Sequence, residues 1–325
     1  MNRILQTQLS RRAFARGGAL AWAGCAIPAL AQGTSGRFVV PYAAGGTGDL
    51  LARAVADRIS ASLGRPVVVD NKPGGGTVIG TQLTAQAPAD GSTLLFVAAS
   101  FVIQPQLLPK APYDALRDFM PVTLMASNPH VLVVHPSVPA TTLTEFLAWA
   151  RTHRAAFASF GNGSSGHLGF ELFKKAGGFD MVHAAYKGSA PATQDLLAGN
   201  VQAMFADLPQ VLGSIRAGRL RALAVGSALR DTALPEVPTF AEAGLPGVQS
   251  QSWYGVVVKS GTPPETVQRL HAAISAALDD PRLRQILEPA GLDFAASGSK
   301  AFGDFLRSEA ARYGEAIRVS GAKAD

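Results

Sequence analysis

Two glycine-rich segments carry residue types that can bind an anion. The first is Gly45-Gly46-Thr47-Gly48-Asp49, which lies between an apolar run and a helical pattern of apolar residues. Glycines leave backbone N–H groups uncovered, and the start of a helix adds unpaired N–H groups and a favourable dipole. Thr47 can add a hydroxyl, and Asp49 can cap the helix or accept a hydrogen bond from a ligand. The segment predicts an anion-binding site, with a purely structural turn as the alternative.

The second segment, Gly161-Asn162-Gly163-Ser164-Ser165-Gly166-His167, repeats this combination in the second half of the chain. It again offers small residues, hydroxyl groups and a following helix. Two such segments predict that an anionic group is held from both sides, by amides and hydroxyls at two helix N-termini. His167 lies on the predicted helix, where we expect it to pack or cap rather than to act as a base.

The same segments argue against several catalytic chemistries. The first has neither Walker nor dinucleotide-binding spacing. The second lacks the final glycine of a nucleophile elbow, because His167 stands there. The six histidines form no pair at metal-ligand spacing, and Cys25 is the only cysteine. We therefore expect no catalytic residues, no cofactor and no metal; turnover of a bound acid would instead support an enzyme.

Short apolar runs alternate with helical patterns, which predicts an α/β fold with mainly parallel sheets flanked by helices. Predicted strands lie at 37–42, 66–70, 93–97, 130–136, 156–160, 181–186, 201–206, 221–226 and 253–259. Predicted helices lie at 51–63, 77–87, 142–154, 166–177, 190–199 and 208–218, with a long helix after 264 and a last one over 302–317. Lys187-Gly188-Ser189 and Asp207 end predicted strands, where crevices in α/β sheets bind ligands; ordinary strand-end polarity is the alternative.

Residues 1–31 have the composition of a secretion signal. A basic segment contains Arg11-Arg12-Ala13-Phe14, an apolar run follows, and Ala29-Leu30-Ala31 predicts cleavage near Ala31. The paired arginines resemble a twin-arginine signal, and a Sec signal stays open. Cys25 partly mimics a lipoprotein cleavage box, so lipidation is a further alternative. Either route predicts export to the periplasm.

The formal net charge of +6 is largely a property of this leader. Four of the 29 Lys and Arg residues lie in the first sixteen positions, and residues 32–325 carry 25 basic and 23 acidic side chains. They contain no Lys or Arg run that could follow a phosphate backbone, which argues against a nucleic-acid partner. They also contain no stretch of eighteen apolar residues, so we expect a soluble mature chain.

Nine short segments occur in an order and spacing similar to those of the substrate-binding proteins of tripartite tricarboxylate transporters, the Bug family of periplasmic receptors. These segments are 41–49, 69–76, 89–95, 161–164, 186–188, 217–225, 234–239, 242–244 and 261–263. The resemblance extends over residues 37–295. Many family members have proline where Thr47 or Gly48 stands, and before Tyr186, which leaves the ligand's identity open among di- and tricarboxylates, aromatic acids, amino acids and uncharged amides.

The resemblance implies a two-lobed Venus-flytrap fold that closes on its ligand, with lobe 1 at 32–137 and 250–325 and lobe 2 at 138–249. It implies a periplasmic receptor that captures a small carboxylate-containing metabolite and delivers it to the membrane subunits of such a transporter. The alternative is the ligand-binding component of a sensory system. We expect a monomer. The implied ligand contacts are Tyr42, Gly45, Gly46, Thr47, Gly48, Asp49, Ser100, Gly163, Ser164, Ser165 and Asp207.

Overall fold

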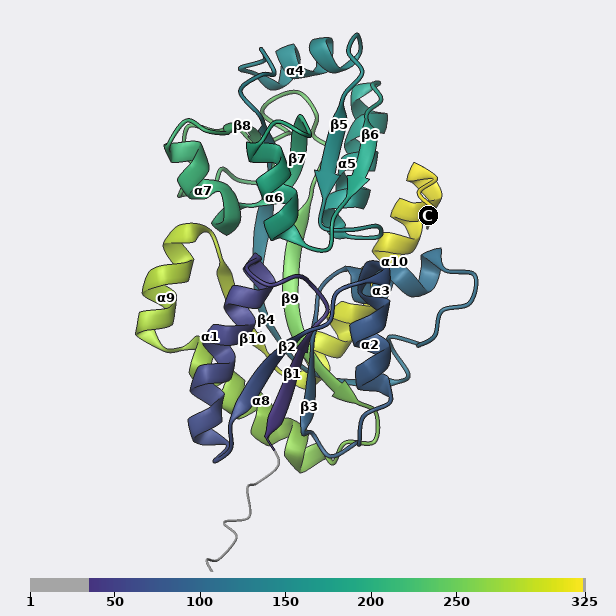
Figure 1. Ribbon diagram of the computed structural model, residues 1–325, viewed down its shortest axis with the longest axis vertical. Helices are drawn as coiled ribbons and strands as arrows, with labels where there is room; N and C mark the ends of the chain where they lie inside the picture. Colours follow the sequence, from purple (N-terminus) through teal and green to yellow (C-terminus); the bar gives the residue numbers. More distant parts are fainter. Residues whose placement is uncertain (1–34, 324–325) are drawn as a thin grey trace, which may run out of the picture. The chain divides into compact units, whose positions relative to one another are not determined.

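Strand β4 (Phe119–Val134) joins the two halves of a ten-stranded sheet in the computed structural model, which describes residues 35–323. Its first part pairs with β9 (Gln251–Lys259) and β10 (Asp293–Ser297). From His130 onward it pairs with β7 (Ala203–Asp207) and β8 (Arg221–Val225). Each half carries its own helices and forms a lobe (Figure 1). The predicted two-lobed α/β fold is confirmed.

In the first lobe, alternate residues of β1 (Gly36–Val40) face opposite layers of helices. Phe38 and Val40 pack with residues of α1 and α8, whereas Val39 packs with residues of α3 and α10. The sheet order is β2-β1-β3-β9-β4. The other elements of this lobe are β2 (Val67–Asn71), β3 (Thr93–Val97), α1 (Thr47–Ser62), α2 (Val78–Ala85), α3 (Ser100–Leu107), α8 (Pro264–Leu278), α9 (Pro281–Leu287), α10 (Ser299–Ser320) and two 3-10 turns (Gly75–Thr77, Glu288–Ala290).

The second lobe repeats this two-faced packing around β4 and β7. Leu132 and Phe205 pack on the side of α4 and α5, and Val133 and Met204 on the side of α6 and α7. The sheet order is β4-β7-β5-β6. The remaining elements are α4 (Leu143–Ala150), β5 (Ala156–Ser159), α5 (Ser165–Gly177), β6 (Val182–Ala185), α6 (Ser189–Leu197) and α7 (Leu208–Arg216).

Most strands of each lobe run in one direction, as predicted, with β9 and β10 reversed in the first lobe and β4 reversed in the second. The β1–β2, β1–β3, β5–β6 and β5–β7 pairs are parallel, but β4 and β9 run antiparallel to each of their sheet neighbours. The physical reason is that β4 is shared by both half-sheets and β9 returns the chain alongside it. The lobe boundaries at 137–138 and 249–250 stay predictions; the pairing of β4 changes from β9 to β7 at Pro129–His130. The predicted leader lies outside the described residues.

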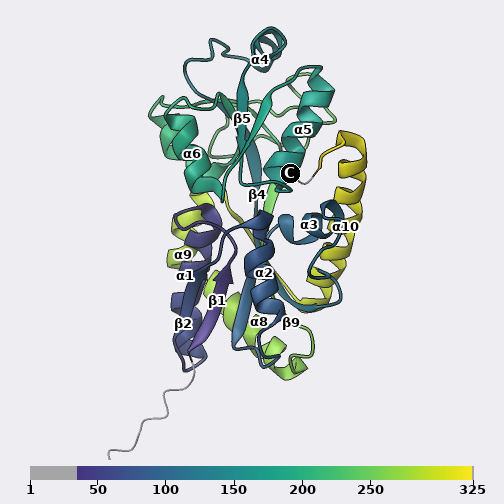
Figure 2. The same ribbon diagram turned by 45° about the vertical axis from the view of Figure 1, so that its right-hand side comes forward.

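Five helices begin between the lobes. Helices α1 and α3 follow the carboxyl ends of β1 and β3, and α5, α6 and α7 follow those of β5, β6 and β7. Figure 2 shows α1 and α6 meeting across the boundary of the lobes. Because parallel strands end at the same edge of a sheet, this order brings the helix starts together.

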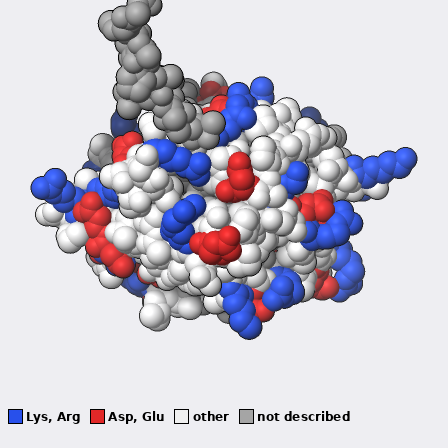
Figure 3. Space-filling view, turned by 90° about the horizontal axis from the view of Figure 1, so that it is seen from below, with Lys and Arg blue, Asp and Glu red and all other residues white. Residues whose placement is uncertain are grey.

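The described surface carries both signs of charge. On the face at the first-lobe end, Lys and Arg side chains are interspersed with Asp and Glu (Figure 3). That face therefore offers no continuous basic stripe of the kind that follows nucleic acid. Among residues 35–323, no helix is both long and apolar enough to cross a membrane.

Candidate functional site

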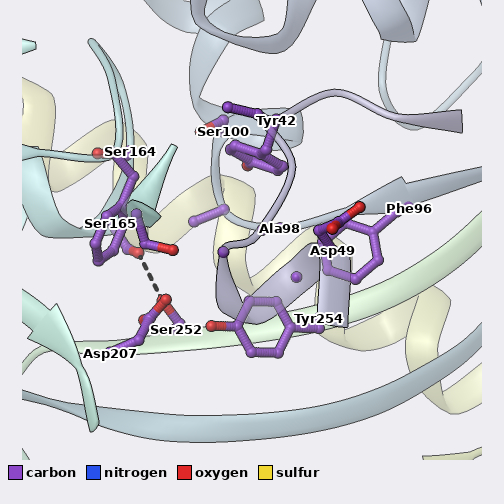
Figure 4. A pocket seen from close by; sticks show the side chains of 16 residues that line it. Tyr42, Asp49, Phe96, Ala98, Ser100, Ser164, Ser165, Asp207, Ser252 and Tyr254 are labelled. Carbon is purple, nitrogen blue, oxygen red and sulfur yellow. Dashed lines mark hydrogen bonds between the residues drawn. The ribbon is translucent and has the colours of Figure 1, made fainter. Parts of the chain in front are cut away.

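A small cavity lies between the lobes (Figure 4). Its volume is about 30 Å³, room for roughly two water molecules. A neighbouring cavity of about 250 Å³ shares Tyr42, Ser100 and Phe160 with it. The small cavity is lined by Tyr42, Ala43, Gly46, Gly48, Asp49, Phe96, Ala98, Ala99, Ser100, Phe160, Ser164, Ser165, Ser189, Asp207, Ser252 and Tyr254.

Each of the five helix starts contributes a residue to this lining. Gly46, Ala99, Ser164 and Asp207 are the N-cap residues of α1, α3, α5 and α7, and Ser189 is the first residue of α6. Each helix N-terminus carries unpaired N–H groups and about half a positive charge. No Lys or Arg is among the lining residues of the described chain. The positive potential of this small cavity therefore comes from the backbone, whereas the neighbouring cavity is also lined by Lys187.

Asp49 holds the first glycine-rich loop in shape. Its carboxylate accepts hydrogen bonds from the Gly45 N–H at 2.9 Å, from Arg53 Nε at 3.0 Å and from Asn71 Nδ2 at 2.8 Å. Burial alone would raise the pKa of Asp49, but these hydrogen bonds outweigh burial and lower it. Gly45 has φ of +84°, a conformation that favours glycine. Asp49 is thus held by three donors of its own lobe.

The two lobes touch beside this loop. Ala43 N–H donates to the Lys187 carbonyl at 2.7 Å, and Thr47 N–H donates to Ser189 Oγ at 3.3 Å. A Cβ added at Gly46 would lie 2.6 Å from Ser189 Oγ. Gly46 has an ordinary extended backbone, so its small size rather than its flexibility matters here. A larger residue at this position would require the Ser189 hydroxyl to move for the lobes to approach as closely.

The second glycine-rich loop is held by its own side chains. Ser164 Oγ caps α5 by accepting the His167 N–H at 3.2 Å, and His167 Nδ1 accepts the Gly163 N–H at 3.2 Å. The His167 ring stacks on His183 with centroids 3.9 Å apart. The expectation that His167 packs or caps is confirmed by these contacts. Ser165 Oγ reaches the opposite strand at 3.5 Å from Ser252 Oγ.

A chain of hydrogen bonds forms the floor beside Asp207. Ser252 Oγ donates to Asp207 Oδ1 at 2.7 Å. His130 lies between two serines, with Nε2 at 2.9 Å from Ser252 Oγ and Nδ1 at 2.7 Å from Ser250 Oγ. Burial lowers the pKa of His130 to about 4, although the charge of Asp207 acts in the opposite direction. His130 is therefore neutral at neutral pH.

Aromatic rings form the remaining wall. The Phe96 ring contacts those of Tyr42 and Tyr254, with centroid distances of 6.3 and 5.6 Å. Burial raises the pKa of Tyr42 to about 12, so its hydroxyl keeps its proton and can donate. The buried Tyr254 hydroxyl has no hydrogen-bond partner among the described residues. A buried hydroxyl of this kind is available to a ligand.

The structure brings most of the predicted site residues to the cavity. Tyr42, Gly46, Gly48, Asp49, Ser100, Ser164, Ser165 and Asp207 are part of its lining. Gly45, Thr47 and Gly163 lie beside it within the same loops and do not line it.

Sequence reasoning missed several residues of the wall. Ser252 and Tyr254 alternate with the buried Trp253 along β9, and their polar groups in an otherwise apolar strand are the signal that could have identified them. Phe96 and Phe160 are typical core residues in type and spacing, so no sequence signal sets them apart. Ser189 was recognised only as a strand-end residue.

The hydroxyl and imidazole groups of the second glycine-rich loop are engaged within that loop. Ser164 uses its hydroxyl to cap a helix, and His167 is occupied by its own loop. Within residues 35–323, no group of three or more His, Cys, Asp or Glu side chains is placed to hold a metal ion. The arrangement can hold an anion at the helix starts and accept a hydrogen bond at Asp207.

Comparison with known proteins agrees with this arrangement. Residues 51–321 match the family model described as tripartite tricarboxylate transporter family receptor. Protein BugT of Bordetella pertussis is 38% identical over 311 residues, which cover 94% of this chain and 95% of that protein.

Two solved structures have the same fold. One is R. palustris Rpa4515 with adipate: TM-score 0.85, 33% identity, covering 89% of this chain and 98% of that one. The other is MatC from Rhodopseudomonas palustris with bound malate: TM-score 0.83, 29% identity, covering 87% and 98%. The predicted resemblance is confirmed, and the chain belongs to the family of tripartite tricarboxylate transporter receptors.

Proposed function

We propose that this protein is a periplasmic solute receptor that captures a small carboxylate-containing metabolite between its lobes. The observation that carries the proposal is the meeting of five helix N-termini around one cavity without a lysine or arginine in its lining. Unpaired N–H groups in a region shielded from water bind a carboxylate through charge-assisted hydrogen bonds. The adipate and malate of the related structures are both carboxylates, which supports the same ligand class here.

Closure of the lobes is the proposed binding step. The glycine-rich loop of α1 belongs to one lobe and the start of α5 to the other, so a ligand between them stabilises the closed form over the open one. The contacts of Ala43 with Lys187 and of Thr47 with Ser189 form in that closed arrangement. The ligand then lies out of contact with bulk water.

The proposed partners are the membrane subunits of a tripartite tricarboxylate-type transporter, to which the closed receptor delivers its solute. The family description supports this assignment. We propose binding without turnover, because the hydroxyl and imidazole groups of the second loop are engaged in holding that loop.

Thermal unfolding of residues 32–325 with a panel of small carboxylic acids and their matched amides tests the proposal. A ligand at one hundred times its Kd adds about 2.7 kcal/mol to the free energy of unfolding, which raises Tm by several degrees. We expect a rise with at least one acid and none with its amide. A rise with amides or cations alone would contradict the carboxylate assignment.

A further inference from the structure

We propose that Asp207 forms a second subsite that accepts a hydrogen bond from an ammonium or hydroxyl group on the ligand. The preferred substrates are then amino or hydroxy carboxylic acids rather than plain acids of the same length. This inference rests on the proposed function, because it assumes that the ligand's carboxylate lies at the helix starts. It adds the chemical group that the ligand must carry beside that carboxylate.

The charge of Asp207 is not compensated by the protein. The side chain is buried at the end of β7, and no Lys or Arg among residues 35–323 forms an ion pair with it. Within the described part of the chain, the basic group found within 4 Å is His130, whose Nε2 is 3.6 Å from Oδ1. His130 is itself buried between two serines and neutral at neutral pH. A buried carboxylate without a cationic partner is costly, so a donor from the ligand would stabilise it.

The direction of the hydrogen bonds shows that Ser252 and His130 have no further proton to offer Asp207. Because Ser252 gives its single hydroxyl proton to Asp207 Oδ1, its oxygen must accept from His130 Nε2–H. The other nitrogen of His130 then carries no proton and accepts from Ser250. Asn128 Nδ2 also reaches Oδ1, at 3.4 Å. Every described hydrogen bond to this carboxylate therefore ends on the same oxygen.

The second oxygen, Oδ2, has no hydrogen-bond partner among the described residues. Asp207 is the N-cap residue of α7, yet its side chain accepts no hydrogen bond from the helix. Burial, followed by the charge of Asp207, raises the pKa of the nearby Tyr254, whose hydroxyl therefore keeps its proton; this hydroxyl lies beside Asp207 without a hydrogen bond of regular geometry. Asp207 lines the cavity, and in Figure 4 it lies with Ser252 on the opposite side from Asp49.

The two ends of the cavity therefore select different groups. The helix starts favour an anion, whereas a second anion beside Asp207 would meet a like charge, and a methylene group would leave Oδ2 buried without a donor. An ammonium or hydroxyl group supplies that donor. Sites that hydrogen-bond a ligand's N–H or O–H group discriminate strongly against analogues that lack it.

Titration calorimetry with two matched series tests the subsite. The series are succinate, malate and aspartate, and propanoate, lactate and alanine. In at least one series, we expect the hydroxy or the amino acid to bind at least about tenfold more tightly than its parent acid. The derivative that binds more tightly shows whether a hydroxyl or an ammonium group donates to Asp207. A parent acid that binds as tightly as both derivatives would overturn the inference while leaving the carboxylate receptor intact. No binding by any acid of these series or of the wider panel would overturn both proposals.

The variant Asp207→Asn separates recognition from structure. Its amide oxygen can still accept from Ser252, while its NH₂ group replaces the accepting Oδ2. We expect the Kd of the preferred amino or hydroxy acid to rise at least about tenfold. The Kd of the parent acid should stay unchanged or fall, because a like charge is removed.

The matched control is Asp304→Asn, the same change at an exposed carboxylate that bonds to Lys300 and Arg307; it should leave every Kd unchanged. Equal loss for all three acids of a series in Asp207→Asn would assign Asp207 a structural role and overturn the inference. If this variant does not fold, the ranking of the two series in the wild-type protein decides alone.

Discussion

At the scale of single residues, burying the polar groups of the cavity floor lowers the free energy of unfolding, and apolar residues could form the same fold without this loss. Among the described residues, Asp207 accepts hydrogen bonds from Ser252 and Asn128 but has no Lys or Arg partner, and the Tyr254 hydroxyl has no hydrogen-bond partner. His130 is satisfied, but only as a neutral ring between Ser250 and Ser252. Buried polar groups with unmet hydrogen bonds call for an explanation, and a ligand in the cavity supplies one.

The buried state of His130 predicts a specific loss of stability in acid. Its folded pKa of about 4 lies below the ordinary value of 6.5, so the unfolded chain binds the proton first. This residue's contribution is therefore complete above about pH 6.5 and is lost as the pH falls toward 4. At pH 5 the loss is about 2 kcal/mol. Urea unfolding at pH 7 and pH 5 measures it, with His130→Gln as the non-titrating comparison.

The wild-type protein and His130→Gln should differ in how steeply the free energy of unfolding falls as the pH is lowered. Other acid-sensitive groups act equally in both, so the difference between the two slopes belongs to His130. Parallel slopes would mean that the ring is protonated in the folded protein. That result would also supply Asp207 with a cationic neighbour.

At the scale of elements, the sequence predicts those strands and helices whose pattern is regular. Strand β5 and helix α5 begin or end within one or two residues of the predicted limits, because apolar runs and glycines mark their ends. The first part of β4 was missed, since Pro121 and Pro129 argue against a central strand; the register of β4 shifts between Pro121 and Thr123. Helix α3 was missed as well, and it contains Pro105.

The same contrast applies to the site. Local signals identify the glycine-rich loops, because glycines before a helix predict exposed N–H groups. The convergence of five helix starts depends on how the two lobes meet, which no local pattern contains. Tyr254 and Ser252 reach the cavity only because β9 lies beside β4 at the junction of the lobes.

The approach of α1 to α6 predicts the effect of enlarging Gly46. In Gly46→Val the new side chain meets Ser189 Oγ across the crevice and opposes closure. Overpacking of this kind costs about 1–3 kcal/mol, so we expect Kd to rise at least about fivefold while the fold stays intact. Titration calorimetry with the ligand identified in the carboxylic-acid panel measures Kd. Far-UV circular dichroism measures whether the fold is intact.

Two further variants show whether a rise in Kd of Gly46→Val comes from the contact with Ser189. Adding Ser189→Ala to Gly46→Val returns space and should recover part of the affinity. Gly213→Val is the matched control, because Gly213 is exposed on α7 and a Cβ there has no neighbour within 4 Å. Unchanged binding by Gly46→Val would remove this loop from the binding site.

At the scale of the whole molecule, β4 and β9 connect two lobes that also touch at their loops. Besides the contacts at Ala43 and Thr47, the α3 side chain of Gln104 donates from Nε2 to the Asn162 carbonyl at 2.5 Å. Such bonds exist only when the lobes are together, whereas in an open form water can satisfy the same groups. They therefore stabilise closure rather than either lobe.

Gln104→Ala should weaken binding without touching the cavity, because Gln104 is not part of its lining. Losing one hydrogen bond costs the closed form about 0.5–1.5 kcal/mol, so Kd should rise roughly two- to twelvefold. Small-angle scattering should give the same radius of gyration as wild type at saturating ligand.

Gln106→Ala is the control on the same helix, since Gln106 bonds to the carbonyls of Val102 and Ala310 within the first lobe. It should lower stability slightly and leave Kd unchanged. If both variants weakened binding equally, α3 would act by supporting the first lobe. If neither did, closure would be determined by the glycine loops and the crossing strands, and the bond from Gln104 to Asn162 would form without contributing to the equilibrium between open and closed forms.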